Sequence, residues 1–356
     1  MLDYITGYLS QNVTPGEAGN QLWALVYILI IFAGVSLIVM AMNWIERKVL
    51  AHMQVRLGPM RVGPHGLLQP IADGLKLFFK EDLTPPYVHK TLYLLAPILS
   101  LALALTSIAV IPIGGWITLN GARIPLQITD VNVALLIILG ITSMGVYGVA
   151  LAGWSSNSKY SLLGSLRASA QMVSYEVALG LSLVGVLILS GTFSLRSIVE
   201  HQSGGFWHWN IFGGGQIVAF FIYLCAAYAE TNRIPFDLPE AETELVAGYH
   251  TEYSSMKFAM FFMSEYANMV TVACLASVLF LGGWGGPVFG PPLLRALLPV
   301  LWFFLRVVFF LFVYIWVRGT LPRFRYDQLM GFSWKVLLPL SVANVVITSL
   351  VVALRS

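Results

Sequence analysis

The sequence predicts an all-α fold, that of a polytopic integral membrane protein. Of its 356 residues, 58% are hydrophobic and only 10% are charged, and the mean hydropathy is +0.78. Soluble domains carry about 25% charged residues, so this composition indicates a chain that lies largely in lipid. The apolar residues gather into segments of roughly 20, the length that an α-helix needs to cross a bilayer. We expect about eight transmembrane helices and one amphipathic helix on the cytoplasmic side.

Eight segments have the length and composition of membrane spans. They are 22–45, 91–112, 131–152, 169–191, 214–230, 257–283, 293–317 and 333–353. The sequence contains no internal repeat of the transporter kind, no Ser/Gly linker and no low-complexity tract. We therefore expect a single membrane domain over residues 1–356, in which 1–21 form a periplasmic N-terminal extension.

The basic residues predict the orientation of the chain. Of the 20 Lys and Arg residues, 15 fall in one set of alternate loops. Because cytoplasmic loops carry the excess of Lys and Arg, these loops are predicted to be cytoplasmic and both termini periplasmic. No import presequence is visible, which favours the inner (plasma) membrane of a bacterium, although an organelle-encoded chain would also lack one.

The longest cytoplasmic loop, residues 46–90, contains a second helical pattern. The charged residues 46–48 are expected to end the first helix, and the Gly-Pro pairs at 58–59 and 63–64 are turn signals. Apolar residues then recur at helical spacing and polar residues fill the other face: Leu67, Leu68, Ile71, Leu75, Phe78 and Phe79 against Gln69, Asp73, Lys76 and Lys80. The segment is too short and too charged to span, so we expect it to lie along the membrane interface. A simple surface anchor is the alternative to a functional role.

The loop 230–257 holds the densest group of acidic side chains. Six of the chain's 17 Asp and Glu residues occur in the 24 positions 229–252. They are Glu230, Asp237, Glu240, Glu242, Glu244 and Glu252, opposed within the stretch by Arg233. Like charges that crowd together disfavour full ionisation, so such a group can load and release protons near neutral pH. A solvated acidic loop is the alternative, but the apolar segments 234–236 and 245–247 favour burial beside the charges.

Two further carboxylates lie inside predicted spans. Glu176 belongs to the fourth span and Glu265 to the sixth, each 8 residues past a predicted cytoplasmic boundary. At a helical rise of 1.5 Å per residue, both lie about 12 Å below that boundary, where they can face each other. Ionisable residues inside a membrane usually face a polar interior or an ion path. A structural ion pair of one glutamate with Arg306 is the alternative.

The sequence carries no motif for metal or redox-cofactor chemistry. The two cysteines, Cys225 and Cys274, stand alone in apolar segments, and the six histidines show no paired ligand spacing. Walker, GxGxxG and GxSxG motifs are also missing. We expect no cofactor bound by this chain, no metal site and no catalytic residue of its own.

Two long motifs resemble the signature sequences of a known family. They are Gly66-Leu-Leu-Gln-Pro-Ile-Ala-Asp-Gly-Leu-Lys-Leu-Phe-Phe-Lys-Glu81 and Pro235-Phe-Asp-Leu-Pro-Glu-Ala-Glu-Thr-Glu-Leu-Val-Ala-Gly248. The family is the H-type membrane subunit (the NADH dehydrogenase subunit 1 type) of proton-pumping NADH:quinone oxidoreductase, respiratory complex I. Shorter matches at 46–48, 56–59, 174–176, 265–266 and 318–327 accompany them, and the resemblance runs from about residue 22 to the C-terminus.

The resemblance implies a subunit at the junction of the membrane arm with the peripheral arm, at the membrane end of a quinone tunnel. The first span, the interfacial helix and the sixth span would frame the tunnel entrance. The residues implied to line the tunnel are Glu46, Arg47, Gln69, Asp73, Lys76, Phe78, Arg233 and Phe236. The residues implied to couple quinone reduction to proton translocation are Glu176, Glu230, Asp237, Glu240, Glu242, Glu244, Glu252 and Glu265.

The resemblance also implies the partners. The substrate is a quinone, ubiquinone or menaquinone, and the electron donor, the last iron–sulfur cluster, belongs to a neighbouring peripheral subunit. Small membrane subunits and the lipid bilayer are the other expected partners, and no nucleic acid is expected. Two alternatives remain. One is the homologous subunit of a plastoquinone- or hydrogenase-type relative without NADH input, and the other is a stand-alone secondary transporter, which would usually show repeats and broken helices.

Overall fold

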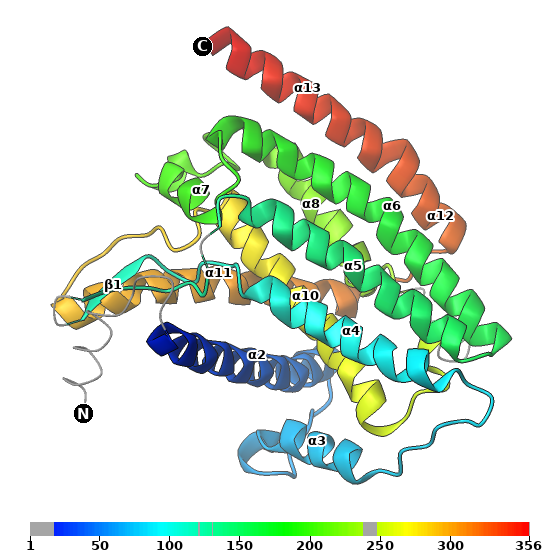
Figure 1. The fold of residues 1–356 in the computed structure, drawn as a ribbon. Coiled ribbons are helices and arrows are strands. Elements are labelled where there is room, and N and C mark those ends of the chain that lie inside the picture. Colours follow the sequence, from blue (N-terminus) through cyan, green and yellow to red (C-terminus); the bar gives the residue numbers. More distant parts are fainter. Residues whose placement is uncertain (1–17, 120–121, 130, 238–247, 356) are drawn as a thin grey trace.

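The structure is a computed structural model that describes residues 18–119, 122–129, 131–237 and 248–355. Over these residues the chain is almost wholly helical, and seven helices are long and apolar enough to cross a membrane. The prediction of an all-α, multi-pass membrane protein is confirmed (Figure 1).

The described elements follow one another along the chain with short connections. The helices are α2 (Ala18–Met53), α3 (Gln69–Phe79), α4 (Lys90–Ile108), α5 (Ala134–Ser155), α6 (Lys159–Ser190), α7 (Leu195–His201), α8 (Ile217–Glu230), α10 (Ser255–Phe280), α11 (Pro292–Thr320), α12 (Tyr326–Phe332) and α13 (Leu338–Arg355). Single turns of 3-10 helix are η1 (Pro64–Gly66), η2 (Phe206–His208) and η3 (Gly248–His250), and η4 (Ser333–Leu337) is a π-helical turn.

The fifth predicted span, 214–230, is shorter than expected. Its helix α8 has 14 residues, which cover about 21 Å of a bilayer core that is about 30 Å thick. Three successive glycines precede it, and the last, Gly215, has a φ of +66° that a helix cannot continue through. The described residues therefore hold seven full-length candidate spans and one shorter apolar helix, where the hydropathy pattern predicts eight spans.

Two helices are longer than their predicted spans. Helix α2 continues through the charged residues 46–48 to Met53, so these residues do not end it. Helix α6 begins at Lys159, which leaves residues 156–158 as the only connection to α5 in place of the predicted loop 153–168. Hydropathy marks where a helix leaves the lipid, whereas the backbone hydrogen bonds of a helix continue into water wherever no Gly or Pro interrupts them.

Two further features depart from simple spans. Strands β1 (Trp116–Leu119) and β2 (Ala122–Pro125) form an antiparallel hairpin between α4 and α5, with Trp116 opposite Pro125. The last predicted span, 333–353, begins earlier, at α12, and passes through the π turn before α13. A π turn rotates the face that a helix presents to its neighbours. The side chains with which α12 and α13 face their neighbours therefore do not form one continuous stripe.

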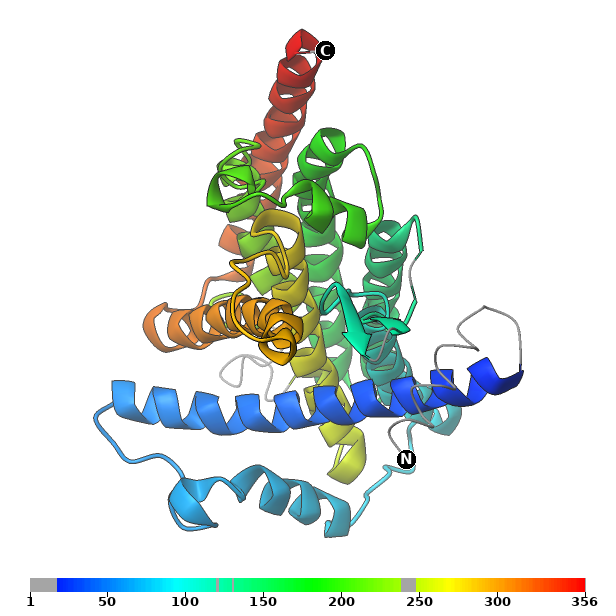
Figure 2. The same ribbon diagram turned by 90° about the vertical axis from the view of Figure 1, so that its left-hand side faces the viewer.

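Helix α10 is the centre of the bundle. It packs against α2, α3, α4, α7, α8 and α11 and contacts α6. Helix α2 lies across the lower half of α10, and α3 runs below α2, on the outside of the bundle (Figure 2). By contrast, α13 belongs to the candidate span that the rest of the chain buries least. The predicted amphipathic helix is confirmed as α3, with Ile71, Leu75, Phe78 and Phe79 exposed.

Small side chains let α5 and α6 approach closely. At Gly153 of α5, an added Cβ would lie 2.5 Å from the carbonyl oxygen of Ser161 and would overlap the side chain of Ser165. Helices in membranes associate through such small-residue contacts, because lipid supplies no hydrophobic drive for helices to pack.

Replacing Gly153 with Ala should therefore separate α5 from α6 and reduce the amount of folded protein. An overpacked contact of this kind costs about 1–3 kcal/mol. The measurement is the melting temperature and the amount of the assembled protein in membranes. Gly140→Ala on the same helix is the matched control, because a Cβ at Gly140 meets nothing within 4 Å. If both variants assemble equally well, the close approach at Gly153 has no energetic role.

Candidate functional site

A small polar cavity lies where α8 ends. Its lining includes Glu230, Asn232, Tyr249, Glu265 and Asn268, together with Gly145 of α5. The space open to the centre of a water molecule is about 20 Å³, which is room for about one water. Glu230 and Glu265 are thus brought to one cavity from α8 and α10, although they lie far apart in sequence.

The end of α8 is held in place by a buried amide. Gln171 of α6 donates through Nε2 to the carbonyl oxygens of Ala229, at 2.8 Å, and Phe236, at 2.7 Å. Asn232 takes a positive φ of 51°, the conformation in which Asn commonly ends a helix. The chain therefore turns back immediately after Glu230, and this turn sets the carboxylate at the wall of the cavity.

Two of the described carboxylates that lie between helices have a hydroxyl partner. Tyr249 donates to Glu265 Oε1 at 3.0 Å. Ser143 of α5 donates to Glu176 Oε1. Buried carboxylates are costly without such partners, so the hydroxyls make these positions tolerable.

The predicted face-to-face pair of Glu176 and Glu265 stays a prediction. Helices α6 and α10 contact each other, but Glu176 does not line the cavity that holds Glu265. Glu230 interacts with one and shares a cavity with the other. The predicted depth also stays a prediction, because the start of α6 at Lys159 does not show where the helix enters the lipid. The alternative of an ion pair with Arg306 is wrong, since Arg306 donates to the carbonyls of Gly283 and Gly285 and lies over Trp209.

A second cluster gathers around Glu46, one of the predicted tunnel residues. Glu46 of α2 is 6% exposed and accepts hydrogen bonds from Arg318 of α11 and, at 2.7 Å, from the Tyr266 hydroxyl of α10. Arg233 lies 3.9 Å from the same carboxylate, with its guanidinium 4.1 Å from the centroid of the Tyr266 ring. Glu46 therefore joins α2, α10, α11 and the segment after α8.

The polar face of α3 is attached to α2. Arg47 donates to Asp73 Oδ2 at 2.7 Å, and Gln69 donates to Asp73 Oδ1 at 3.2 Å. Lys76 lies 3.5 Å from the same carboxylate. Phe78, the remaining α3 residue of the predicted tunnel, is exposed on the other face. The four predicted tunnel residues from positions 47–76 thus form one contact set, and Phe78 does not belong to it.

The described part of the acidic stretch is divided between two environments. Asp237 is 3% exposed and accepts a hydrogen bond from Arg323 at 3.0 Å. Glu252 accepts a hydrogen bond from Tyr87 at 2.8 Å, and this bond raises the pKa of Tyr87. Glu240, Glu242 and Glu244 belong to 238–247, which lie outside the described residues.

Close to this stretch, His250 is uncharged. Its ring packs against Tyr249, Phe258 and Phe261, and burial lowers the pKa of His250 to about 3. It is neutral at cytoplasmic pH and adds no positive charge beside the acidic residues.

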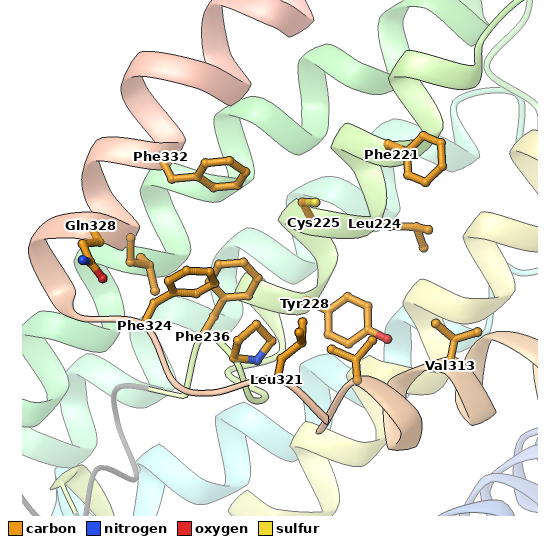
Figure 3. A pocket seen from close by; sticks show the side chains of 13 residues that line it. Phe221, Leu224, Cys225, Tyr228, Phe236, Val313, Leu321, Phe324, Gln328 and Phe332 are labelled. Carbon is orange, nitrogen blue, oxygen red and sulfur yellow. The ribbon is translucent and has the colours of Figure 1, made fainter. Parts of the chain in front are cut away.

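An apolar cavity of about 500 Å³ lies between α8, α11 and α12. Phe221, Leu224, Cys225 and Tyr228 of α8 form one wall, and Phe236 and Phe324 line another part of it with ring centroids 5.6 Å apart (Figure 3). None of the side chains that line this cavity is an acid or a base of the Asp, Glu, His, Lys or Arg type. The cavity suits an apolar chain, and Phe236 is the predicted tunnel residue that reaches it.

Several partners in these clusters were not among the predicted site residues. They are Tyr87, Ser143, Tyr249, Tyr266, Arg318 and Arg323. Most are neutral hydroxyls with no pattern in sequence that distinguishes them from other Ser, Thr and Tyr residues. The two arginines belong to the basic loop 318–327, for which the positive-inside rule is already a sufficient explanation.

A multi-pass membrane protein with carboxylates held between its helices is the class that this fold and these clusters define. The family model described as NADH dehydrogenase matches residues 26–349. The H subunit numbered 2 of the Koribacter versatilis NADH-quinone oxidoreductase is 72% identical over 88% of this chain and 92% of its own length. The H subunits numbered 1 of Geobacter sulfurreducens and Solibacter usitatus are 54% and 49% identical, over 92% and 93% of this chain and 94% and 96% of their own lengths.

The chain belongs to the family of the H subunits of NADH-quinone oxidoreductase, which are membrane subunits of respiratory complex I. Other complex I subunits are therefore its partners.

Removing one member of the Glu46 cluster should destabilise the assembled protein. Arg318→Met leaves a buried carboxylate with weaker compensation, and such changes cost about 3–5 kcal/mol. Glu46→Gln combined with Arg318→Met removes the uncompensated charge and should recover part of the loss. The measurement is the melting temperature of the purified complex.

The control for this series is Arg325→Met. Arg325 pairs with Asp327 at 3.3 Å on the surface, where an ion pair contributes about 0–1 kcal/mol. If Arg325→Met and Arg318→Met lower the melting temperature equally, the Glu46 cluster does not hold these helices together.

Proposed function

We propose that this chain forms the membrane end of the quinone site of complex I and carries the charge change of quinone reduction into the membrane through its carboxylates. Quinone is reduced at the interface with the peripheral arm, by electrons from an iron–sulfur cluster in a neighbouring subunit. The chain itself handles protons and charge, and its substrate is ubiquinone or menaquinone.

The observation that carries the proposal is the series of carboxylates between helices. Tyr249 joins Glu265 to the polar cavity, the cavity reaches Glu230, and Glu230 interacts with Glu176. The cavity has room for about one water, which can bridge groups that line it, such as Glu265 and Glu230. The acidic stretch, including Glu240, Glu242 and Glu244, would feed this series from the cytoplasmic side.

The proposed quinone entrance lies along α2, α3 and α10. Helix α3 contacts both of the others, and its polar face is tied to α2 through Arg47 and Asp73. Its exposed residues Leu75 and Phe78 offer an apolar surface to lipid or to an isoprenoid tail. An amphipathic helix held in this way can guide an apolar substrate out of the bilayer.

The names of the relatives favour this proposal over the subunit of a plastoquinone- or hydrogenase-type complex, because all three are named as subunits of NADH-quinone oxidoreductases. The stand-alone transporter is excluded by the family. We further propose that the basic loops face the cytoplasm, that both termini are periplasmic, and that the chain contacts the peripheral quinone-site subunits and the small membrane subunits.

If the carboxylates carry protons, an amide in place of Glu230 should stop the coupling, because an amide cannot titrate. Glu230→Gln should lower quinone reductase activity and proton pumping by at least about tenfold, the scale on which acid–base groups contribute. Glu230→Asp keeps a titratable group and should retain part of both activities. NADH oxidation by an artificial acceptor, which uses only upstream cofactors, should stay unchanged and measures the amount of assembled complex.

Glu265→Gln and Glu265→Asp form the parallel series. Wild-type pumping in both Gln variants, at normal complex content, would show that these carboxylates only form polar contacts between helices and carry no protons.

The quinone entrance is tested at Leu75, which is exposed on α3. Leu75→Gln should raise the apparent KM for quinone severalfold, because it places an amide on the surface proposed for the tail, while kcat changes less. Leu354→Gln is the control, since Leu354 is also an exposed leucine but lies at the far end of α13. Normal quinone kinetics in an assembled Leu75→Gln complex would leave α3 as a membrane anchor alone.

A further inference from the structure

The apolar cavity between α8, α11 and α12 is a groove that opens at the surface of the chain. Its base is formed by the buried side chains of Tyr228, Phe236 and Leu329, whereas Phe221 and Leu321 on its border are exposed. A groove with a buried base and an exposed border can receive a ligand from the side. We call it the α8–α11 groove and define it by the 13 side chains drawn in Figure 3.

The lining of the α8–α11 groove suits an apolar ligand. Of the 13 side chains, only those of Tyr228 and Gln328 carry an oxygen or a nitrogen. Its volume of about 500 Å³ falls within the range of about 300–1,000 Å³ that ligand pockets have. The groove therefore has the size and the chemistry to hold a hydrocarbon chain.

The size of the lining side chains argues against a helix of another subunit as the occupant. The rings of Phe221, Phe236, Phe324 and Phe332 belong to the lining, and no Gly, Ala or Ser is among the described lining residues. Helices that dock in a membrane meet through small residues that let the two backbones approach, as α5 and α6 do at Gly153. A groove lined by large rings instead fits a flexible chain that adapts its shape to them.

Positive charge gathers beside one end of the groove. Phe324 lines the groove, and its neighbours in the chain are Arg323 and Arg325. The Arg325 side chain is 77% exposed, and Lys335, in the π turn that follows α12, is exposed as well. Over residues 323–335 these three cations face a single carboxylate, that of Asp327. Basic residues at the end of an apolar groove between membrane helices attract an anionic headgroup.

The tail of a quinone would fit the lining equally well but does not account for the charge. A quinone headgroup is uncharged, so it gains little from Arg325 and Lys335. In addition, the described residues that line the groove include none from α2, α3 or α10, along which the proposed quinone entrance lies. The groove and the entrance are thus two separate apolar surfaces of the chain.

We propose that the α8–α11 groove binds an anionic phospholipid, with one acyl chain between α8, α11 and α12 and the phosphate beside Arg325 and Lys335. The site goes beyond the proposed function and does not depend on it.

The bound chain supports the start of the acidic stretch. Phe236 and Phe324, which it contacts, stack with ring centroids 5.6 Å apart, and the Phe324 amide donates to the Pro235 carbonyl at 3.1 Å. The residues next to these two rings, Asp237 and Arg323, form the ion pair at 3.0 Å. The lipid therefore fills the space behind the contact that fixes Asp237.

The test uses the intact purified complex and phosphatidylglycerol that carries a diazirine in one acyl chain. After illumination of washed complex, the cross-linked peptides are mapped by mass spectrometry. We expect labels within 221–228 and 321–332. Unlabelled phosphatidylglycerol should compete at least about fivefold better than phosphatidylcholine, the scale on which one basic residue attracts an anionic lipid. Peptides of α13, which is exposed but lines no part of the groove, report contact with bulk lipid and should lose their label on washing.

Cys225 allows the groove to be filled from within, because its small side chain lies in the wall. Cys225→Trp should lower the label at least about fivefold, whereas Cys225→Ala, which leaves the groove open, should keep it. Phosphatidylglycerol should raise the melting temperature of the delipidated wild-type and Cys225→Ala complexes but not that of Cys225→Trp.

The headgroup site is tested by a second variant, which changes only exposed side chains. Arg325→Gln combined with Lys335→Gln should abolish the preference for phosphatidylglycerol over phosphatidylcholine. Lys90→Gln, which removes an exposed cation at the start of α4, is the matched control and should keep the preference.

Three results would overturn the proposal. Ubiquinone that competes as well as phosphatidylglycerol would identify the groove as a site for the quinone tail. Labels that disappear equally from the groove and from α13 on washing would indicate bulk lipid only. Labels on α13 without any in the groove peptides would show that another subunit covers the groove.

Discussion

The buried carboxylate of Glu46 is the interaction on which the arrangement of the helices depends. It lies where α2, α10, α11 and the segment after α8 meet, and it accepts from Arg318 and Tyr266 with Arg233 at 3.9 Å. Taking these charges out of water is costly, and the cost is offset only when all the partners are in place. The cluster therefore sets a condition on helix packing. Its charges are compensated only when these helices, which are far apart in sequence, meet around Glu46.

The same condition recurs deeper in the protein, with hydroxyls in place of cations. Glu265 accepts a hydrogen bond from Tyr249 and Glu176 accepts one from Ser143, and the helix α5 that supplies Ser143 has no charged residue. A cation would hold a carboxylate permanently ionised, whereas a hydroxyl can serve either protonation state. Glu46, which is surrounded by cations, thus holds helices together. The deeper carboxylates have hydroxyl partners, which are compatible with either protonation state.

The sequence predicts much of the fold, because a bilayer imposes a simple rule on hydropathy. Long apolar segments correspond to α4, α5, α10 and α11 within a few residues. The helix ends are predicted less well, since α2 and α6 continue past the lipid on residues that hydropathy reads as loop. The hairpin β1–β2 is too short to leave a recognisable sequence pattern.

The candidate site, too, was predicted from the sequence only in part. The carboxylates could be predicted, because charge inside a span is rare and costly. Their partners Tyr249, Tyr266 and Ser143 could not, because which hydroxyl reaches which carboxylate depends on how helices far apart in sequence pack.

The π turn before α13 has a mechanical consequence. Ser333 and Trp334 within it donate to the backbone and side chain of Ser174 at 3.1 and 3.3 Å, and Tyr175 donates to the Leu329 carbonyl just before it, at 2.9 Å. Ser174 and Tyr175 directly precede Glu176, so the turn of α6 that carries this carboxylate is bonded to the start of the candidate span that the rest of the chain buries least. A small rotation of that turn would displace the distal end of α13 by a much larger distance, because α13 extends away from the point of attachment.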